Sequence, residues 1–116
     1  MLNGHDLFGV PTSLRRLGFK TVLSIVNTYY KAIDEQAEVI LRYDIEDIKI
    51  KHCQYMLIYI LHLMGWSYLD IGTEFAISDS GIDGIVELMR FILYWNPQYQ
   101  NELTGLAQLI NEWEEK

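Results

Sequence analysis

Residues 67–88 read SYLDIGTEFAISDSGIDGIVEL, and this stretch decides the fold expected of the chain. Ile71 and Phe75 are four residues apart, as on one face of a short helix, and Ile82 and Ile85 are three apart on a following helix. Two short helices that cross steeply and are held by a few apolar residues form a helix-turn-helix. The spacing therefore predicts a helix-turn-helix within residues 67–95, with two ordinary packed helices and a capped turn as the alternative.

The residues around these apolar pairs suit a turn. Ser67 and Ser78 each precede a helical stretch, where a serine side chain can accept free amide hydrogens of the first turn. Gly72 is small where the two helices must cross closely, and Ile77 lies in the turn. Ala76 occupies the position that usually holds a glycine with positive φ, at a cost of about 1 kcal/mol.

The first third of the chain has helical apolar spacing from Phe19 onward, which predicts one amphipathic helix to about Tyr43, with a break near Ile33 as the alternative. A brief turn of helix from Thr12 or Ser13 through Leu17 would precede it. Residues 1–12 are short, polar and glycine-containing, and are expected to form an N-terminal arm.

A central helix is expected over residues 44–65, begun by Asp44 and ended by Gly65. It is apolar on nearly every side after His52, as a helix surrounded by others must be. Its most apolar part, residues 53–66, is shorter than the roughly 20 residues that a membrane-spanning helix needs. The pattern therefore indicates a buried core helix and no membrane segment.

The last third predicts two further helices. The helix capped by Ser78 would continue to about Trp95, because the residue before Pro97 is pushed out of helical geometry. A final helix would begin near Pro97, with a buried stripe formed by Leu103, Leu106, Ile110 and Trp113. No segment alternates with a two-residue period, so no sheet is expected. The fold class is all-α: a compact bundle of about five helices in a single domain over residues 1–116.

Charge divides the chain into two halves. The net charge is −7; residues 1–66 are balanced, and residues 67–116 hold nine acids and two bases. An acidic surface repels phosphate backbones and attracts basic partners. The single cysteine, Cys53, cannot make an intramolecular disulfide and is expected to be buried in a reducing compartment. Residues 1–10 show no signal peptide, which favours a cytoplasmic protein.

Three segments resemble the C-terminal DNA-binding domain of the bacterial replication initiator DnaA. Residues 25–31, IVNTYYK, resemble its opening helix, and residues 96–110, NPQYQNELTGLAQLI, its closing helix. Residues 54–75, QYMLIYILHLMGWSYLDIGTEF, resemble its long helix and the first half of its helix-turn-helix. The run from residue 25 to the C-terminus covers about three quarters of the chain. The resemblance implies a DnaA C-terminal-domain-like fold and a role on DNA.

The family's DNA-contacting residues are mostly replaced. The family has an arginine where this chain has Cys53, and a Gly-Gly-Arg-Asp-His-Thr-Thr signature where residues 76–82 read AISDSGI. Of that signature only Asp79 is retained. The basic run before the long helix is reduced to Lys49, Lys51 and His52. Origin-type DNA recognition therefore does not carry over with the fold.

The second helix of the expected helix-turn-helix should present a polar outer face. Three of its positions are acidic and none is basic, whereas a major-groove reader gains affinity by neutralising phosphates. Like charges brought together cost free energy instead. These six positions are the expected partner-binding residues: Ser78, Asp79, Ser80, Asp83, Gly84 and Glu87.

Catalytic chemistry has no motif in this sequence. The histidines His5, His52 and His62 lack metal-ligand spacing to one another. No carboxylate lies in an apolar run, no serine belongs to a nucleophile motif, and no glycine-rich phosphate loop is present. We therefore expect no enzymatic activity, no cofactor and no metal site.

Two functions remain open. The first is a non-catalytic regulator whose acidic face binds a basic protein, such as a nucleic-acid-handling protein, or mimics DNA. The second is binding of double-stranded DNA, in replication or transcription, through phosphate contacts from first-half cations. Those cations are Arg15, Arg16, Lys20, Lys49 and Lys51. A homodimer is compatible with either function.

Overall fold

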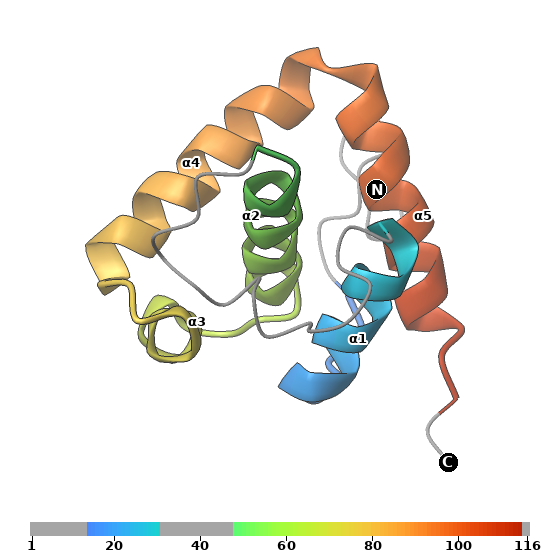
Figure 1. Ribbon diagram of the computed structural model, residues 1–116, viewed down its shortest axis with the longest axis horizontal. Helices are drawn as coiled ribbons and strands as arrows, with labels where there is room; N and C mark the ends of the chain where they lie inside the picture. The colour runs from blue at the N-terminus through green and yellow to red at the C-terminus, as the bar shows by residue number, and fades with distance from the viewer. Residues whose placement is uncertain (1–13, 31–47, 115–116) are drawn as a thin grey trace, which may run out of the picture.

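The computed structural model describes residues 14–30 and 48–114 of the chain. Within these ranges there are five α-helices and no strand, as the all-α prediction requires (Figure 1). The helices are α1 (Phe19–Tyr30), α2 (Ile48–Leu63), α3 (Tyr68–Phe75), α4 (Asp79–Trp95) and α5 (Pro97–Asn111).

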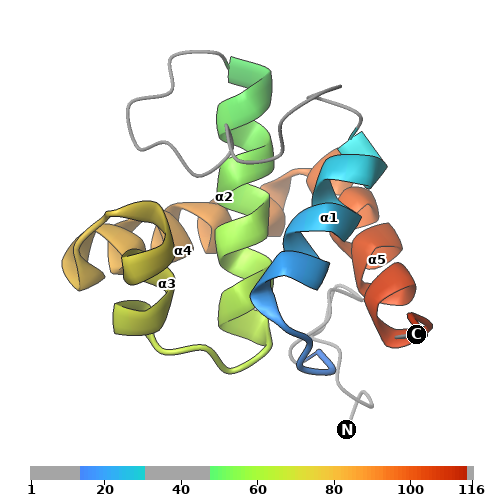
Figure 2. The ribbon, with the colours of Figure 1, turned by 60° about the horizontal axis from the view of Figure 1, so that its bottom comes forward.

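The central position of α2 organises the fold. α2 packs against each of the other four helices, and α4 and α5 meet at an angle beside it (Figures 1 and 2). Met56, Leu57, Ile60 and Leu61 are fully buried, which confirms the prediction that this helix lies in the core. Such burial follows from apolar side chains on nearly every face of the helix. Cys53 is also buried.

The turn between α3 and α4 is built as the sequence indicates. The Ser67 hydroxyl accepts a hydrogen bond of 3.1 Å from the Asp70 amide, and the Ser78 hydroxyl accepts one of 3.1 Å from the Gly81 amide. Each bond satisfies an amide that the first turn of a helix leaves free. Ala76 ends α3 in the left-handed conformation, with φ of 56°, which a residue with a β-carbon adopts at a cost.

Apolar contacts hold α3 and α4 together. Ile71, Phe75 and Ile82 are fully buried, and Ile85 is half-buried against the same core. The amide of Ile77 donates a 3.0 Å hydrogen bond to the carbonyl of Gly72, so the turn folds back over α3. The apolar pairs of residues 67–88 thus face one common core.

Two local predictions are wrong. Residues 14–17 are not helical, because their backbone bonds elsewhere: the Leu14 amide donates to the Leu63 carbonyl at 3.1 Å, and the Arg15 amide donates to Asn111 Oδ1 at 3.3 Å. Trp113 is 38% exposed instead of buried, because α5 ends at Asn111 before the stripe reaches it.

Some predictions lie outside the described residues. These are the N-terminal arm, the part of the first helix from residue 31 to 43, and the start of the central helix at residues 44–47. Within the described ranges, no helix combines the length and the apolar character that crossing a membrane requires.

Candidate functional site

The polar face of α4 is exposed at all six residues named from the sequence. In its first turn, Ser78 and Ser80 bring their hydroxyl oxygens within 3.2 Å of each other, and Asp79 accepts a 2.9 Å hydrogen bond from the Ser80 amide. These contacts are local and leave the face open to solvent. Asp79, Asp83 and Glu87 then follow one another at four-residue spacing along one side of α4, and we call them the acid row.

Arg90 lies about one helical turn beyond Glu87, at the end of the acid row. It was not among the residues named for this face from the sequence. Its guanidinium forms an ion pair with Glu87, and its Nη2 atom lies 3.4 Å from Nε2 of His62. Burial favours a lower pKa for Arg90, but the Glu87 carboxylate together with Tyr59 and Tyr68 outweighs burial, and the pKa is raised. Burial and the nearby Arg90 charge lower the pKa of His62. The spacing of three residues from Glu87 to Arg90 was the available signal for this pair.

The cations of the first half fall into two groups. Arg15 donates from Nη1 to the Trp113 carbonyl at 2.6 Å, next to the C-terminal end of α5. The Arg16 guanidinium lies 4.8 Å from the ring centre of Trp66, just after α2 ends. Lys20 is exposed in the first turn of α1.

Lys49 and Lys51 are exposed in the first turn of α2, at the opposite end of that helix from Arg16. A helix of 16 residues is about 24 Å long. The structure therefore places Arg15 and Arg16 near the C-terminal end of α2. It separates them from Lys49 and Lys51 by about the length of that helix. The five cations do not form one compact patch.

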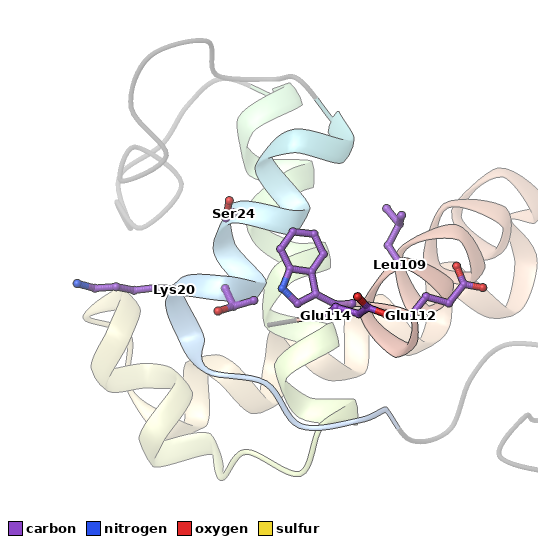
Figure 3. Close-up of a pocket in the computed structure, with 7 residues that line it drawn as sticks. Lys20, Ser24, Leu109, Glu112 and Glu114 are labelled. Carbon is purple, nitrogen blue, oxygen red and sulfur yellow. The ribbon is translucent and has the colours of Figure 1, made fainter. Parts of the chain in front are cut away.

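An open hollow lies between α1 and the C-terminal end of α5 (Figure 3). Its volume is about 960 Å³. Lys20 and Ser24 project from α1, and Glu112 and Glu114 lie on the other side. The lining places one cation opposite two carboxylates, without a nucleophile paired to a base. Seven residues line it: Lys20, Thr21, Ser24, Leu109, Glu112, Trp113 and Glu114.

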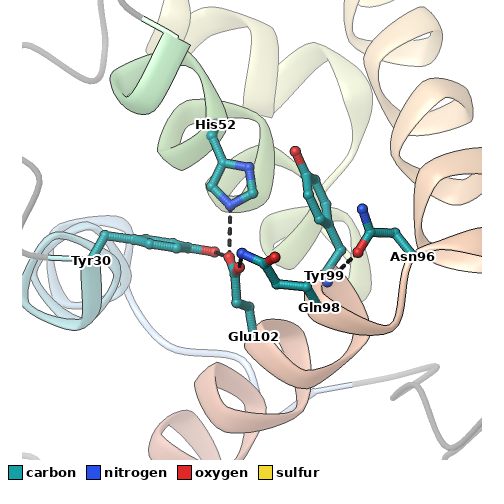
Figure 4. A network of polar contacts seen from close by, with 6 residues as sticks. All are labelled: Tyr30, His52, Asn96, Gln98, Tyr99 and Glu102. Carbon is teal, nitrogen blue, oxygen red and sulfur yellow. Dashed lines mark hydrogen bonds and ion pairs between the residues drawn. The ribbon is translucent and has the colours of Figure 1, made fainter.

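A second hollow, of about 520 Å³, contains a polar network centred on Glu102 (Figure 4). The Tyr30 hydroxyl donates to Glu102 Oε1 at 2.7 Å, and His52 Nε2 lies 2.7 Å from the same oxygen. Gln98 Nε2 donates to the other oxygen at 3.2 Å. The ring of Tyr99 packs edge-on against His52, with centroids 4.5 Å apart. The network joins α1, α2 and α5.

The network keeps the Glu102 carboxyl ionised and the Tyr30 hydroxyl protonated. Burial raises the pKa of Glu102, but the hydrogen bonds from His52, Tyr30 and Gln98 and the electrostatic attraction of His52 together outweigh burial, and the pKa is lowered. Burial and the bond to Glu102 raise the pKa of the Tyr30 hydroxyl, which therefore stays protonated. A general acid would need a raised carboxyl pKa, the opposite of this arrangement. No local sequence pattern indicates this network, because Tyr30 and Glu102 are 72 residues apart.

Metal ligation has no candidate among residues 14–30 and 48–114, where no group of three histidine, cysteine, aspartate or glutamate side chains could hold an ion. Comparison with known protein families and with curated proteins finds no match. The resemblance to the DnaA C-terminal domain therefore stays a prediction.

Proposed function

We propose that this chain is a non-catalytic binding protein that docks a basic segment of a partner protein on the exposed face of α4. The observation that carries the proposal is the acid row. Asp79, Asp83 and Glu87 stand exposed on one side of one helix, and the neighbouring cation, Arg90, is paired with Glu87. Such a surface attracts positive charge and speeds the encounter with a basic partner.

Binding of duplex DNA through this helix is disfavoured by the same charges. A helix that enters the major groove lies between phosphates, where carboxylates are repelled. The first-half cations do not compensate, because Arg16 and the two lysines of α2 lie at opposite ends of that helix. In this proposal the DnaA-like arrangement of helices, with α3 and α4 as a helix-turn-helix, presents an acidic face to a protein.

A binding measurement with two labelled probes tests the proposal. Fluorescence anisotropy would follow a lysine-rich peptide of 18 residues and a 20-base-pair duplex of mixed sequence at physiological salt. We expect the peptide to bind with an affinity that falls as salt rises, and the duplex to bind at least about tenfold more weakly. Tight duplex binding with a steep salt dependence would instead support the first-half cations as a DNA-binding surface.

Matched double variants locate the peptide site. Asp83→Asn with Glu87→Gln removes two charges from the acid row, and Glu112→Gln with Glu114→Gln removes two exposed charges near the end of α5. We expect the α4 variant to lose about fivefold to tenfold in peptide affinity and the α5 variant to change by less than about twofold. Equal losses in both would show that only net charge matters and that α4 is not the site.

A further inference from the structure

α4 carries an apolar row that faces away from the core. Leu88, Phe91 and Trp95 expose 44, 65 and 68% of their surface. Their spacing by three and four residues places them on one side of the helix, and Gly84 continues the same side toward the N-terminus. We call these four residues the outer row. The opposite side of α4 holds the buried residues Ile82, Val86, Met89 and Leu93.

The outer row is large enough to be an interaction surface. An aromatic side chain presents about 150–250 Å², so the exposed parts of Leu88, Phe91 and Trp95 together form a patch on the order of 300–400 Å². Exposed apolar patches of this size mark binding sites on soluble proteins. Because the buried side already anchors α4 to α2 and α3, the outer row is not needed to hold the helix in place.

Charge beside the outer row indicates the occupant. Asp83 directly precedes Gly84, and Glu87 directly precedes Leu88, so the acid row runs parallel to the outer row along α4. A second copy of this chain would bring another acid row and a net charge of −7, and the two would repel. An apolar surface flanked by basic residues is complementary instead.

The backbone amides and carbonyls of the bound segment also need hydrogen-bond partners. The described residues contain no strand edge that could pair with an extended peptide, and the amides of α4 are used within the helix or at its cap. A helical segment bonds its own backbone and can therefore lie on α4 without a strand edge to pair with. The large side chains of the outer row, from Leu88 to Trp95, span about 10 Å of helix, which matches anchors at positions i, i+4 and i+7 of a second helix.

We propose that the outer row and the acid row together bind a basic amphipathic helix of a partner protein. Its apolar side chains pack on Leu88, Phe91 and Trp95, and its lysines or arginines face Asp83 and Glu87. At Gly84 nothing lies within 4 Å of an added β-carbon, so the surface there is open to a close approach. This inference rests on the proposed function and specifies the form of the partner.

Two peptides of the same composition test the inference. In the first, an 18-residue chain of leucine and lysine places every leucine on one face of a helix; in the second, the same residues are scrambled. We expect the amphipathic peptide to bind at least about tenfold more tightly than the scrambled one, and the fluorescence of Trp95 to shift to shorter wavelength on binding. The shift is assigned by comparison with Trp95→Phe.

Protein variants separate the two surfaces. Phe91→Ser with Trp95→Ser should reduce binding of the amphipathic peptide about tenfold and leave the scrambled peptide unaffected. Leu109→Ser, at an exposed leucine of α5, is the matched control and should bind like the unchanged chain. Circular dichroism checks that each variant folds. If Phe91→Ser with Trp95→Ser does not fold, the single variant Trp95→Gln takes its place.

The outcomes distinguish the inference from the proposed function. Equal binding of both peptides, unaffected by the serine variant, overturns the helical partner while acid-row binding stands. Binding of neither peptide overturns both proposals. A dimer detected by sedimentation at tens of micromolar that Phe91→Ser with Trp95→Ser abolishes assigns the outer row to a second copy, and the inference is then wrong.

Discussion

The carbonyl oxygen of Ile77 occupies the space that a β-carbon on Gly72 would need. The turn after α3 therefore lies directly on the backbone of that helix, and the Ile77 amide bonds to the Gly72 carbonyl in the same contact. Position 72 allows no side chain because its neighbour is backbone, which cannot rotate away as a flexible side chain can.

Replacing Gly72 with alanine should destabilise the protein. The added methyl group would force the turn away from α3, at a cost of about 1–3 kcal/mol of unfolding free energy, as for other overpacked sites. Gly84→Ala is the matched control, because a β-carbon there meets nothing and alanine favours helix by about 0.5–1 kcal/mol. Urea denaturation of both variants measures the difference. A neutral Gly72→Ala would mean that the turn does not rest on α3.

Ala76→Gly should stabilise the chain. Ala76 holds φ at 56°, where glycine avoids the steric cost that a β-carbon imposes. The greater freedom of glycine in the unfolded chain offsets part of the gain, so the expected increase is about 0.5–1 kcal/mol. Thermal unfolding followed by circular dichroism checks this, with Ala107→Gly inside α5 as a control that should lower stability.

Ile82→Ala should cost roughly 2–4 kcal/mol, because the side chain is fully buried between α3 and α4 and its removal leaves a cavity. Ile48→Ala is the comparison, since Ile48 is 83% exposed and should lose little. Chemical denaturation gives both values. A loss at position 82 within measurement error would show that Ile82 does not hold the two helices together.

The Glu102 network should make stability depend on pH. The pKa of Glu102 is lower in the folded chain than in the unfolded one, so the unfolded chain binds more protons in the acid range. The stabilisation is therefore present above the ordinary glutamate pKa of about 4.3 and is lost as pH falls through the lower, folded value.

Glu102→Gln should cost about 1–2 kcal/mol at pH 7, a value reduced for the partial exposure of the site. The difference between this variant and the unchanged chain should shrink as the pH approaches about 3. Urea denaturation at both pH values provides the measurement. A difference that stays constant with pH would show that the charge of Glu102 is not what stabilises the network.

Local sequence signals predicted much of the fold. Ser67 and Ser78 mark helix starts because each side chain accepts an amide hydrogen three residues later. The continuous apolar run from Tyr55 to Leu61 likewise predicted the central helix, since only enclosure satisfies it. These signals act within one turn or along one helix, which is why a single sequence contains them.

Contacts between residues far apart in the chain could not be predicted from such local signals. The bonds of Leu14 and Arg15 to the ends of α2 and α5 replaced the helical turn expected there. The network around Glu102 depends on how α1, α2 and α5 meet, and no local pattern encodes that meeting. The six exposed positions of the acidic face followed from helical spacing, whereas the exposure of Phe91 and Trp95 required knowledge of what covers α4.

The contacts of Arg15 with Asn111 and Trp113 join positions 96 and 98 residues apart, so the described chain closes on itself almost like a ring. Bringing such distant positions together costs the unfolded chain considerable loop-closure entropy. A covalent link between residues near 15 and 113 would lower the conformational entropy of the unfolded chain and disturb the folded chain little. For the same reason, a circularly permuted chain whose new ends lie in the α4–α5 turn should retain the helical core.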